Sequence, residues 1–236
     1  MGWQMRQLLY SATWLGILIF GCLPSYIHSE VPIKKAERQN GLLSFLFVGD
    51  TSFGEKYQNE IENRGGMNVL RTKGNQYSIK NFSQILGQAD LVIANLETPL
   101  TNLPFLSPLE GKKPAILWSD PSKTLDTFRK NNISVVSLAN NHTLDYGIRG
   151  LEQTLNALRN YDIQWLGAGF DESAAARPLR FDYLLAGQPF QLVIAAGFGY
   201  WKSYDKKYDF YAKGGKAGTN VWTVARASEQ IRSIRQ

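Results

Sequence analysis

Residues 137–147, SLANNHTLDYG, place two adjacent amides, an imidazole and a carboxylate at the end of an apolar run. The run itself, residues 133–138, is short and β-branched, which predicts a strand buried on both faces, with a helix after it. Polar groups at the end of such a strand lie on the edge where open α/β sheets bind ligands. His142 is the one histidine beyond residue 28, so any chemistry here that needs an imidazole must use it.

Two other segments end in side chains of the same kind. Asp50 follows a predicted strand at residues 42–48, and Asn95 and Glu97 follow another at residues 91–94. Carboxylate and amide oxygens with an imidazole nitrogen suit a hard or borderline divalent cation, so Asp50, Glu97 and Asn141 are candidate ligands. Manganese, magnesium, iron and zinc all remain open. The three segments together predict a metal or phosphate site.

A carboxylate that accepts a hydrogen bond from one nitrogen of an imidazole fixes the tautomer at the other, and Asp145 is placed to do this for His142. Simpler interpretations stand beside each assignment. Asp50 and Asp145 could each cap a following segment, Glu97 could be a solvated loop acid, and His142 could be purely structural. The remaining amides of this set, Asn95 and Asn140, could line the site or only close turns.

The rest of the chain alternates strands, loops and helices, which favours the α/β class with parallel strands and right-handed crossovers. We expect helices at residues 78–88, from Asp120-Pro121 onward, from about residue 148, and at residues 224–234. The first helix would bury one face, made of Ile79, Phe82, Ile85, Leu86 and Ala89. Residues 181–185 and 191–196 predict a hairpin across Gly187-Gln188.

The N-terminal segment has the layout of a secretory leader, which we expect at residues 1–29. Residues 8–23 are mostly apolar and follow Arg6, and the single cysteine, Cys22, ends the stretch IFGC, which resembles a bacterial lipobox. We expect Cys22 to be the lipidation site of a lipoprotein in the bacterial cell envelope, outside the cytoplasm. A cleaved leader, an uncleaved anchor helix and a cytosolic protein are the alternatives. Residues 30–40 predict a tether, and residues 41–236 the folded domain.

Composition excludes several classes of protein. With 44% hydrophobic and 12% aromatic residues the chain is ordinary globular material. The net charge of +6 favours an anionic polymer or membrane surface but is too small to indicate nucleic acid, and no nucleotide-binding motif is present. Residues 200–216 mix aromatic side chains with lysines, which is typical of a solvated loop or of a platform for a polyanion or a sugar.

Four of these stretches resemble the CapA family of poly-gamma-glutamate capsule biosynthesis proteins, which are similar in fold to calcineurin-like metallophosphoesterases. They are VGDTSFG at residues 48–54, ADLVIANLETP at 89–99, the segment from residue 137 to 155, and GAG at 167–169. The resemblance spans about residues 45–180. It implies a metallo-dependent phosphatase-like α/β/β/α sandwich, here with an incomplete C-terminal half.

The resemblance also implies roles for individual residues. Asn141 would bind metal through its side-chain carbonyl, within a site for one or two ions, and His142 would donate a proton near the leaving group. The family has two later landmarks, a His-Trp-Gly segment and a Gly-His-x-x-His-type segment, which supply further imidazole ligands, and this sequence has neither. We therefore expect the N-terminal portion of a longer protein, or a truncated homologue, with an incomplete ligand set and doubtful activity.

Three functions follow as hypotheses. The first is a surface-anchored accessory protein of capsule polymer synthesis or export, whose partners would be poly-gamma-glutamate, the membrane and capsule synthase membrane subunits. The second is an extracytoplasmic metal-dependent hydrolase of phosphoesters or of an amide-linked polymer. The third is a non-catalytic module that binds a polyanion. A serine hydrolase fits poorly, because the chain has no GxSxG elbow.

Overall fold

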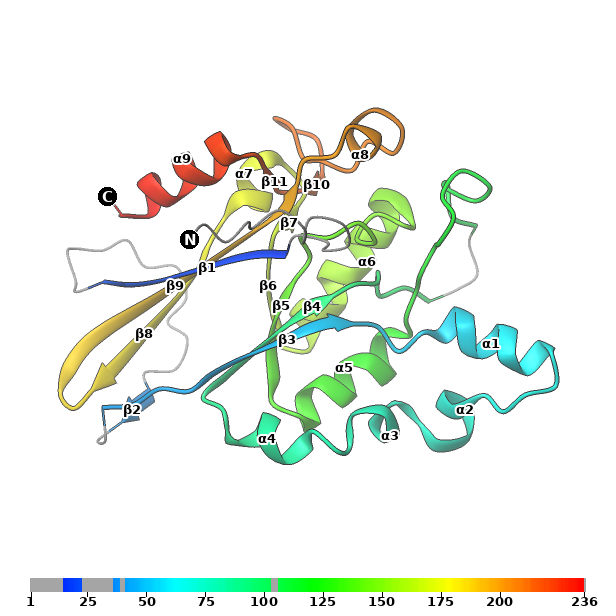
Figure 1. Cartoon of the computed structure of the whole chain (residues 1–236), viewed down its shortest axis with the longest axis horizontal. Coiled ribbons are helices and arrows are strands. Elements are labelled where there is room, and N and C mark those ends of the chain that lie inside the picture. The colour runs from blue at the N-terminus through cyan, green and yellow to red at the C-terminus, as the bar shows by residue number, and fades with distance from the viewer. Residues whose placement is uncertain (1–14, 23–35, 39–40, 103–105, 236) are drawn as a thin grey trace, which may run out of the picture.

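A parallel four-stranded sheet carries the predicted site (Figure 1). The computed structural model describes residues 15–22, 36–38, 41–102 and 106–235. Within these residues the sheet has the order β3-β4-β5-β6, which is also the order along the chain. Its strands are β3 (Phe45–Thr51), β4 (Leu91–Leu96), β5 (Ile133–Ser137) and β6 (Gln164–Leu166). Parallel strands place their carboxyl ends at one edge, so the segments that follow β3, β4 and β5 lie near one another.

A second sheet packs against the first. It has the order β1-β9-β8-β2, with β11 (Val221–Trp222) added parallel to β9. The other members are β1 (Leu15–Cys22), β2 (Ala36–Arg38), β8 (Leu179–Leu185) and β9 (Gln188–Gly199). The predicted hairpin is present as β8 and β9, and its turn at Ala186-Gly187 has positive φ at both residues, as the tight turn between twisted strands requires. A separate short pair joins β7 (Ala168–Gly169) to β10 (Gly218–Thr219).

Two hydrophobic cores lie on opposite faces of the parallel sheet. Alternate residues of β4 enter each core: Val92 and Ala94 pack toward the helices, whereas Leu91 and Ile93 pack against the second sheet. All six residues of β4 are buried. Burial on both faces explains why this strand is a continuous apolar run in the sequence rather than an alternating one. The predicted α/β class, with two stacked sheets, is confirmed.

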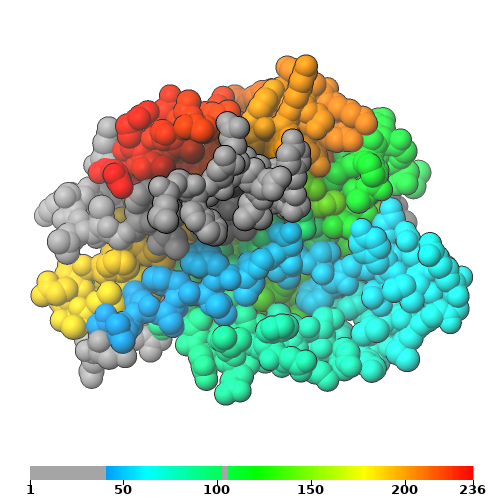
Figure 2. All heavy atoms as spheres, viewed as in Figure 1, coloured from blue at the N-terminus to red at the C-terminus, as the bar shows by residue number. Residues whose placement is uncertain are grey.

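Helices cover the outer face of the parallel sheet. α5 (Pro121–Lys130) and α6 (Gly147–Asn160) contribute buried leucines and Phe128 to that core, and Asp120 caps α5 by accepting a hydrogen bond from the Lys123 amide at 3.0 Å, as predicted. The remaining helices are α1 (Glu55–Asn63), α2 (Val69–Lys73), α3 (Asn75–Ile79), α4 (Ser83–Gln88), α7 (Glu172–Ala176), α8 (Lys202–Lys206) and α9 (Val224–Arg235). Helices α1 to α4 run along one side of the molecule, in cyan to blue-green in Figures 1 and 2.

The helix predicted at residues 78–88 is wrong in both extent and orientation. The chain forms two short helices there, α3 and α4, with a turn at residues 80–82 between them. Leu86 is 2% exposed, but Phe82 and Ile85 are 60% and 56% exposed. The turn at residues 80–82 interrupts the helical spacing, and the five apolar residues do not share one buried face.

The predicted leader and tether lie mostly outside the described residues. Leu15–Cys22 is described and forms strand β1, antiparallel to β9, rather than a helix. Short apolar runs are compatible with either conformation, and the edge of β9 offers unpaired backbone groups to a neighbouring strand. Residues 36–38 of the expected tether form β2 beside β8. Among the described residues, no helix is long and apolar enough to cross a membrane.

Candidate metal centre at the carboxyl ends of the parallel strands

Asp50 and Asn95 face each other on neighbouring strands. The register between β3 and β4 shifts between Val48 and Asp50, so Gly49 is an extra residue and Asp50 pairs with Asn95. A bulge of this kind re-aims the side chain that follows it. The Asn95 amide donates a hydrogen bond to Asp50 Oδ1 at 2.7 Å. Two of the segments identified in the sequence therefore meet through side chains.

Asn140 joins the third segment to the other two. Its amide nitrogen donates to Asn95 Oδ1 at 3.0 Å and to the Leu96 carbonyl at 2.9 Å. Its Oδ1 accepts from the backbone amides of His142 at 2.9 Å and Thr143 at 3.1 Å, which closes the loop after β5. Asn140 is buried and nearly saturated with hydrogen bonds, so its role is to hold the loop against β4 rather than to bind a ligand.

Glu97 lies beside Asp50, and the two carboxylates interact directly. Burial raises the pKa of Glu97 to about 7, and the charge of Asp50 and a hydrogen bond with Asp50 contribute to the rise. Lys113 opposes the shift and Asp145 adds to it slightly. Two crowded carboxyl groups, one of which holds its proton near neutral pH, are the arrangement that a bound cation would relieve.

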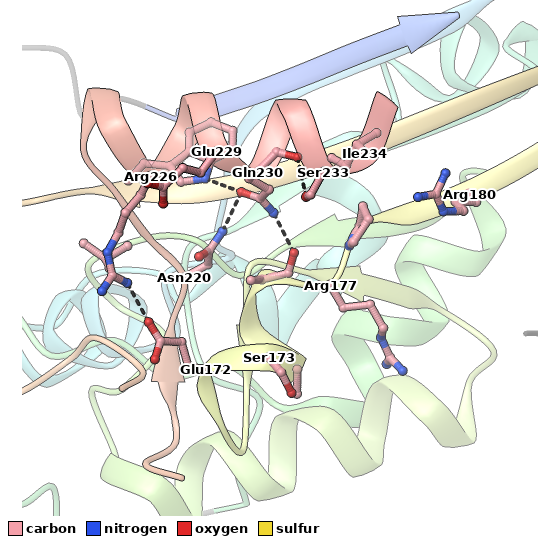
Figure 3. Close-up of a pocket in the computed structure, with 15 residues that line it drawn as sticks. Glu172, Ser173, Arg177, Arg180, Asn220, Arg226, Glu229, Gln230, Ser233 and Ile234 are labelled. Atoms are coloured by element: carbon pink, nitrogen blue, oxygen red, sulfur yellow. Dashed lines mark hydrogen bonds and ion pairs between the residues drawn. The ribbon is translucent and has the colours of Figure 1, made fainter. Parts of the chain in front are cut away.

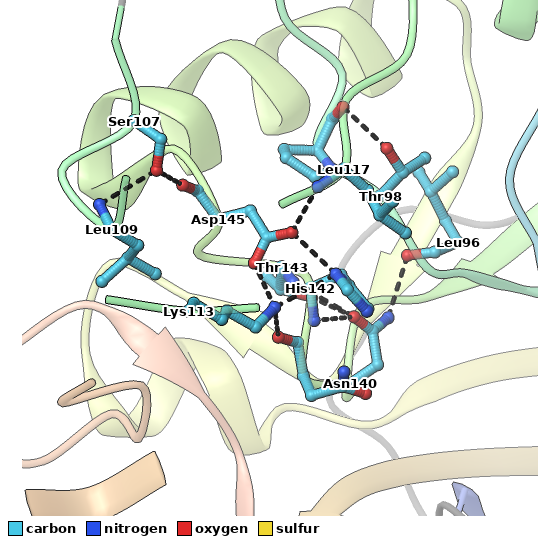
Figure 4. A network of polar contacts seen from close by, with 12 residues as sticks. Leu96, Thr98, Ser107, Leu109, Lys113, Leu117, Asn140, His142, Thr143 and Asp145 are labelled. Atoms are coloured by element: carbon cyan, nitrogen blue, oxygen red, sulfur yellow. Dashed lines mark hydrogen bonds and ion pairs between the residues drawn. The ribbon is translucent and has the colours of Figure 1, made fainter. Parts of the chain in front are cut away.

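A buried cluster joins His142, Asp145 and Lys113 (Figure 4). His142 Nδ1 lies 2.7 Å from Asp145 Oδ2, which also accepts a hydrogen bond from the Leu117 amide at 2.7 Å. Lys113 Nζ donates to Asp145 Oδ1 and to the Asn141 carbonyl at 2.7 Å. Helix α6 has Tyr146 at its N-cap and no side-chain cap, so Asp145 contacts the imidazole instead of capping that helix.

Asn141 provides a test of whether these residues suit a metal. Its side-chain Oδ1 is buried and has no hydrogen-bond partner among the described residues, and a buried amide oxygen without a donor is suited to a cation. With the carboxylates of Asp50 and Glu97 it supplies a set of oxygen donors typical of a hard divalent ion. The described residues contain no group of three or more His, Cys, Asp or Glu side chains able to hold a metal, so the donor set is small.

Lys113 and Tyr204 belong to the site but were not found from the sequence. Lys113 lies in a loop rich in proline and glycine, where a lysine ordinarily indicates a solvated surface. Burial lowers its pKa, while the charges of Asp145 and Glu97 oppose that change. Burial raises the pKa of the Tyr204 hydroxyl, and contact with the Asn141 side chain opposes the rise. Both depend on contacts distant in sequence, which no local pattern signals.

The aromatic and basic segment at residues 200–216 divides between the core and the surface. Phe210 and Tyr211 are buried, and Tyr200 stacks on Tyr211 with ring centroids 5.8 Å apart. The expectation of a solvated loop is therefore wrong for Phe210 and Tyr211, because Phe210 belongs to the core on the helix side of the parallel sheet and Tyr211 to the core between the two sheets. Tyr200 and Trp201 remain about half exposed.

A hollow among the described residues lies away from this site (Figure 3). It has a volume of about 820 Å³ and lies between α9 and the chain that joins α7 to β8. Gln230 bridges it with hydrogen bonds to the Ala176 carbonyl and the Trp222 indole, at 2.6 Å each, and Arg226 pairs with Glu172 at 2.7 Å. None of the candidate site residues lines it.

Fold and site together define an α/β protein of the metallophosphatase-like type, with carboxylates, amides and an imidazole at the carboxyl ends of parallel strands. The family model "Bacterial capsule synthesis protein PGA_cap" matches residues 44–236, and the chain belongs to this family.

Three relatives illustrate the likeness. The chain is 29% identical over 168 residues to the Capsule biosynthesis protein CapA of Bacillus anthracis, a match that covers 69% of this chain and 34% of the relative. It is 26% identical over 153 residues to the PGA biosynthesis protein CapA of Bacillus subtilis, covering 65% and 37%. A probable polyglutamine synthesis accessory protein of Mycobacterium tuberculosis is 38% identical over 90 residues, covering 37% and 22%. The matched region is about a third of the length of the two CapA relatives.

Proposed function

We propose that this protein is an accessory protein of capsule polymer synthesis or export, and that the polymer is poly-gamma-glutamate. The observation that carries the proposal is the family match over residues 44–236, which includes every residue of the candidate site. The names of the relatives, which refer to capsule, PGA and polyglutamine synthesis, support the polymer class. Membrane-bound capsule synthase subunits are the expected partners.

The proposal includes a divalent-metal site formed by Asp50, Glu97 and the side-chain carbonyl of Asn141. A divalent cation bound there would activate a water molecule and neutralise charge on a phosphoryl or carbonyl oxygen. Asn95 orients Asp50 by donating to Oδ1 at 2.7 Å, and Asn140 holds the loop that carries Asn141 and His142. His142 follows Asn141 in the same loop, and its Nδ1 lies 2.7 Å from Asp145 Oδ2.

A metal-dependent hydrolase is the second candidate, favoured by one observation. The ring of His142 is anchored through Nδ1, which leaves Nε2 to hold or deliver a proton at a substrate atom. A phosphoester or an amide linkage would each fit this chemistry.

We also propose an extracytoplasmic location, with attachment to the membrane through the segment at residues 1–29 and lipidation at Cys22. The layout of charge and apolar residues in that segment supports this location. Mass spectrometry of the protein purified from bacterial membranes would detect a lipid on Cys22, and a Cys22→Ser variant should leave the membrane fraction.

The metal site is tested by Mn²⁺ binding to the full chain, measured by calorimetry, for the native protein and for Asp50→Asn and Glu97→Gln. We expect each substitution to weaken Mn²⁺ binding by at least about tenfold. Loss of a group that only supports a metal ligand already has an effect of about this size, and these residues are proposed as ligands themselves. Asp182→Asn, on the exposed face of β8, is the matched control and should bind as the native protein does. Equal affinity in all four proteins would reject the metal site.

The capsule role is tested separately in the host. Deleting the gene should reduce capsule polymer, and the native gene should restore it. An unaltered capsule after deletion would reject the proposed function, whatever the metal measurement shows.

A further inference from the structure

Lys113 is buried, although it lies in a loop whose sequence is typical of a solvated surface. Its side chain is 4% exposed, and that of its partner Asp145 is fully buried. Its neighbour Lys112 is exposed, and the side chain of Lys112 donates to the Pro108 carbonyl at 3.1 Å. Removing an ammonium group from water is costly unless charge and hydrogen bonds compensate, so the contacts of Lys113 indicate what it does.

The polar groups in contact with the Lys113 ammonium all belong to the loop that carries Asn141 and His142. Lys113 Nζ donates to the Asn141 carbonyl at 2.7 Å and to Asp145 Oδ1, and it lies 3.1 Å from His142 Nδ1 (Figure 4). The partners are 28 to 32 residues away along the chain. Phe210 covers the ammonium, with Nζ 5.6 Å from the ring centroid, and thereby limits access of water to it.

The hydrogen bonds determine where the proton of the imidazole lies. Asp145 accepts from Lys113 at one oxygen and from the Leu117 amide at the other, so it is the ionised form that these donors stabilise. A carboxylate can only accept, so a hydrogen shared by Asp145 Oδ2 and His142 Nδ1, 2.7 Å apart, is carried by Nδ1. Lys113 Nζ, 3.1 Å from the same Nδ1, is then a charge contact and not a hydrogen bond, because an ammonium can only donate. In the neutral form of such a ring the lone pair is at Nε2.

We propose that Lys113 is a positioning residue that holds His142 in its Nδ1–H tautomer and holds the Asn141 backbone in place. The ammonium keeps Asp145 an acceptor for the ring and, through the Asn141 carbonyl, holds the backbone of the loop that carries Asn141 and His142. This inference deepens the proposed function. The role of His142 in proton transfer rests on that function, whereas the tautomer of His142 does not.

The tautomer can be measured directly, because the chain has two histidines. In a His28→Gln background His142 is the single imidazole, and its two ring nitrogens can be observed by ¹⁵N NMR in the full chain. We expect one protonated nitrogen, Nδ1, and one unprotonated nitrogen, Nε2. Methionine is close to lysine in length and has no donor, so in Lys113→Met the two tautomers should exchange. The ¹⁵N signals of the two ring nitrogens should then move toward a common value. Lys112→Met, the matched control, should keep the native pattern.

A native ¹⁵N pattern in folded Lys113→Met would overturn the proposal. Because that variant leaves Asp145 buried without its ammonium, it could fail to fold. Lys113→Gln, which keeps a neutral donor for Asp145 Oδ1 and removes only the charge, is the second variant, and the same measurement is made on it. Loss of the single tautomer in folded Lys113→Gln supports the proposal, and its persistence rejects it.

Mn²⁺ binding separates this inference from the proposed function. If the site binds metal, Lys113→Met should weaken binding on the order of tenfold, as expected for a group that orients a ligand. If the native protein binds no Mn²⁺ but shows the Nδ1–H tautomer, lost in Lys113→Met, the metal site fails and the positioning role stands. If the native protein binds Mn²⁺ and Lys113→Met leaves the ring pattern unchanged, the positioning role fails alone.

Discussion

Glu97 shows how a single side chain depends on groups that the sequence separates. It follows β4, and its pKa is raised to about 7 by burial and by Asp50, which is 47 positions earlier. Nothing within a few residues of Glu97 predicts that shift. The presence of an acid there was predictable from the segment ANLETP, but its protonation behaviour was not.

The raised pKa predicts a pH dependence of stability in the metal-free protein. The ordinary pKa is 4.5 and the folded value is about 7, so between these values the folded state binds more protons than the unfolded state. The free energy of unfolding attributable to Glu97 therefore falls as pH rises from 4.5 to 7. Glu97→Gln should remove this loss. The loss is measured by the melting temperatures of the native protein and of Glu97→Gln at about pH 5 and about pH 8, in the presence of a chelator. Equal changes in melting temperature in the two proteins would contradict the prediction.

The types of residue in the candidate site were predictable from the sequence, but Lys113, which supports them, was not. The structure brings together Asp50, Asn95 and Asn140 by hydrogen bonds, and places Glu97 beside Asp50. All four end or follow strands, and parallel strands share an edge, so their meeting follows from the pattern. Lys113 comes from a loop whose path depends on tertiary packing, and its sequence neighbours give no sign of burial.

Among the elements, the strands of the parallel sheet and the longer helices were predicted closely, whereas the region between β3 and β4 and the strands β1 and β2 were not. The strands β4 and β5 and the helices α5 and α6 have strong periodic patterns and recognisable starts. Residues 78–88 satisfy a helical pattern too, but they are divided between two short helices. Short helices derive their stability from packing, so the fit to the rest of the molecule overrides the local pattern.

Gly167 offers a test of how β6 supports the site loop. It has φ of +86°, and a Cβ there would lie 2.6 Å from Ala139 Cβ, next to Asn140. Gly167→Ala should lower the free energy of unfolding by about 1–3 kcal/mol through overpacking, in addition to the strain of positive φ. Urea unfolding measures the change.

The control for that substitution is Gly187→Ala, in the turn between β8 and β9. Gly187 has a similar φ of +78°, but a Cβ at this position would have no other atom within 4 Å, so the variant reports the backbone strain alone. Equal losses in the two variants would show that contact with Ala139 contributes nothing.

The whole molecule is organised around a parallel sheet that is covered on both faces. One face meets helices and the other meets the second sheet, and this leaves the carboxyl edge for polar groups. The basic segment that was a candidate polyanion platform is less available than its composition indicates. Lys206 and Lys213 pair with Asp205, whose pKa they lower to about 2, and Lys216 pairs with Asp209.

Binding to poly-gamma-glutamate by the whole chain should therefore be modest and sensitive to salt. Raising NaCl to about 0.5 M should weaken it severalfold, because exposed charges are screened at such ionic strength. Lys202→Glu with Lys207→Glu should weaken it further, since both lysines are exposed on this segment. Lys123→Glu with Lys130→Glu, at exposed positions of α5, makes the same change in net charge and is the control. Fluorescence anisotropy with labelled polymer measures all three, and binding that persists unchanged in high salt would contradict a charge-driven contact.

The sequence by itself determined the class of fold, the order of its strands along the chain, and the side-chain types that gather at one sheet edge. It could do so because hydrophobic periodicity and strand ends are local properties. Only the tertiary structure decided that Asp50 pairs with Asn95 across a bulge, that α3 and α4 are separate, and that Lys113 is buried beside His142 and Asp145. Each of these depends on contacts between residues far apart in the chain, where packing and desolvation outweigh local preference.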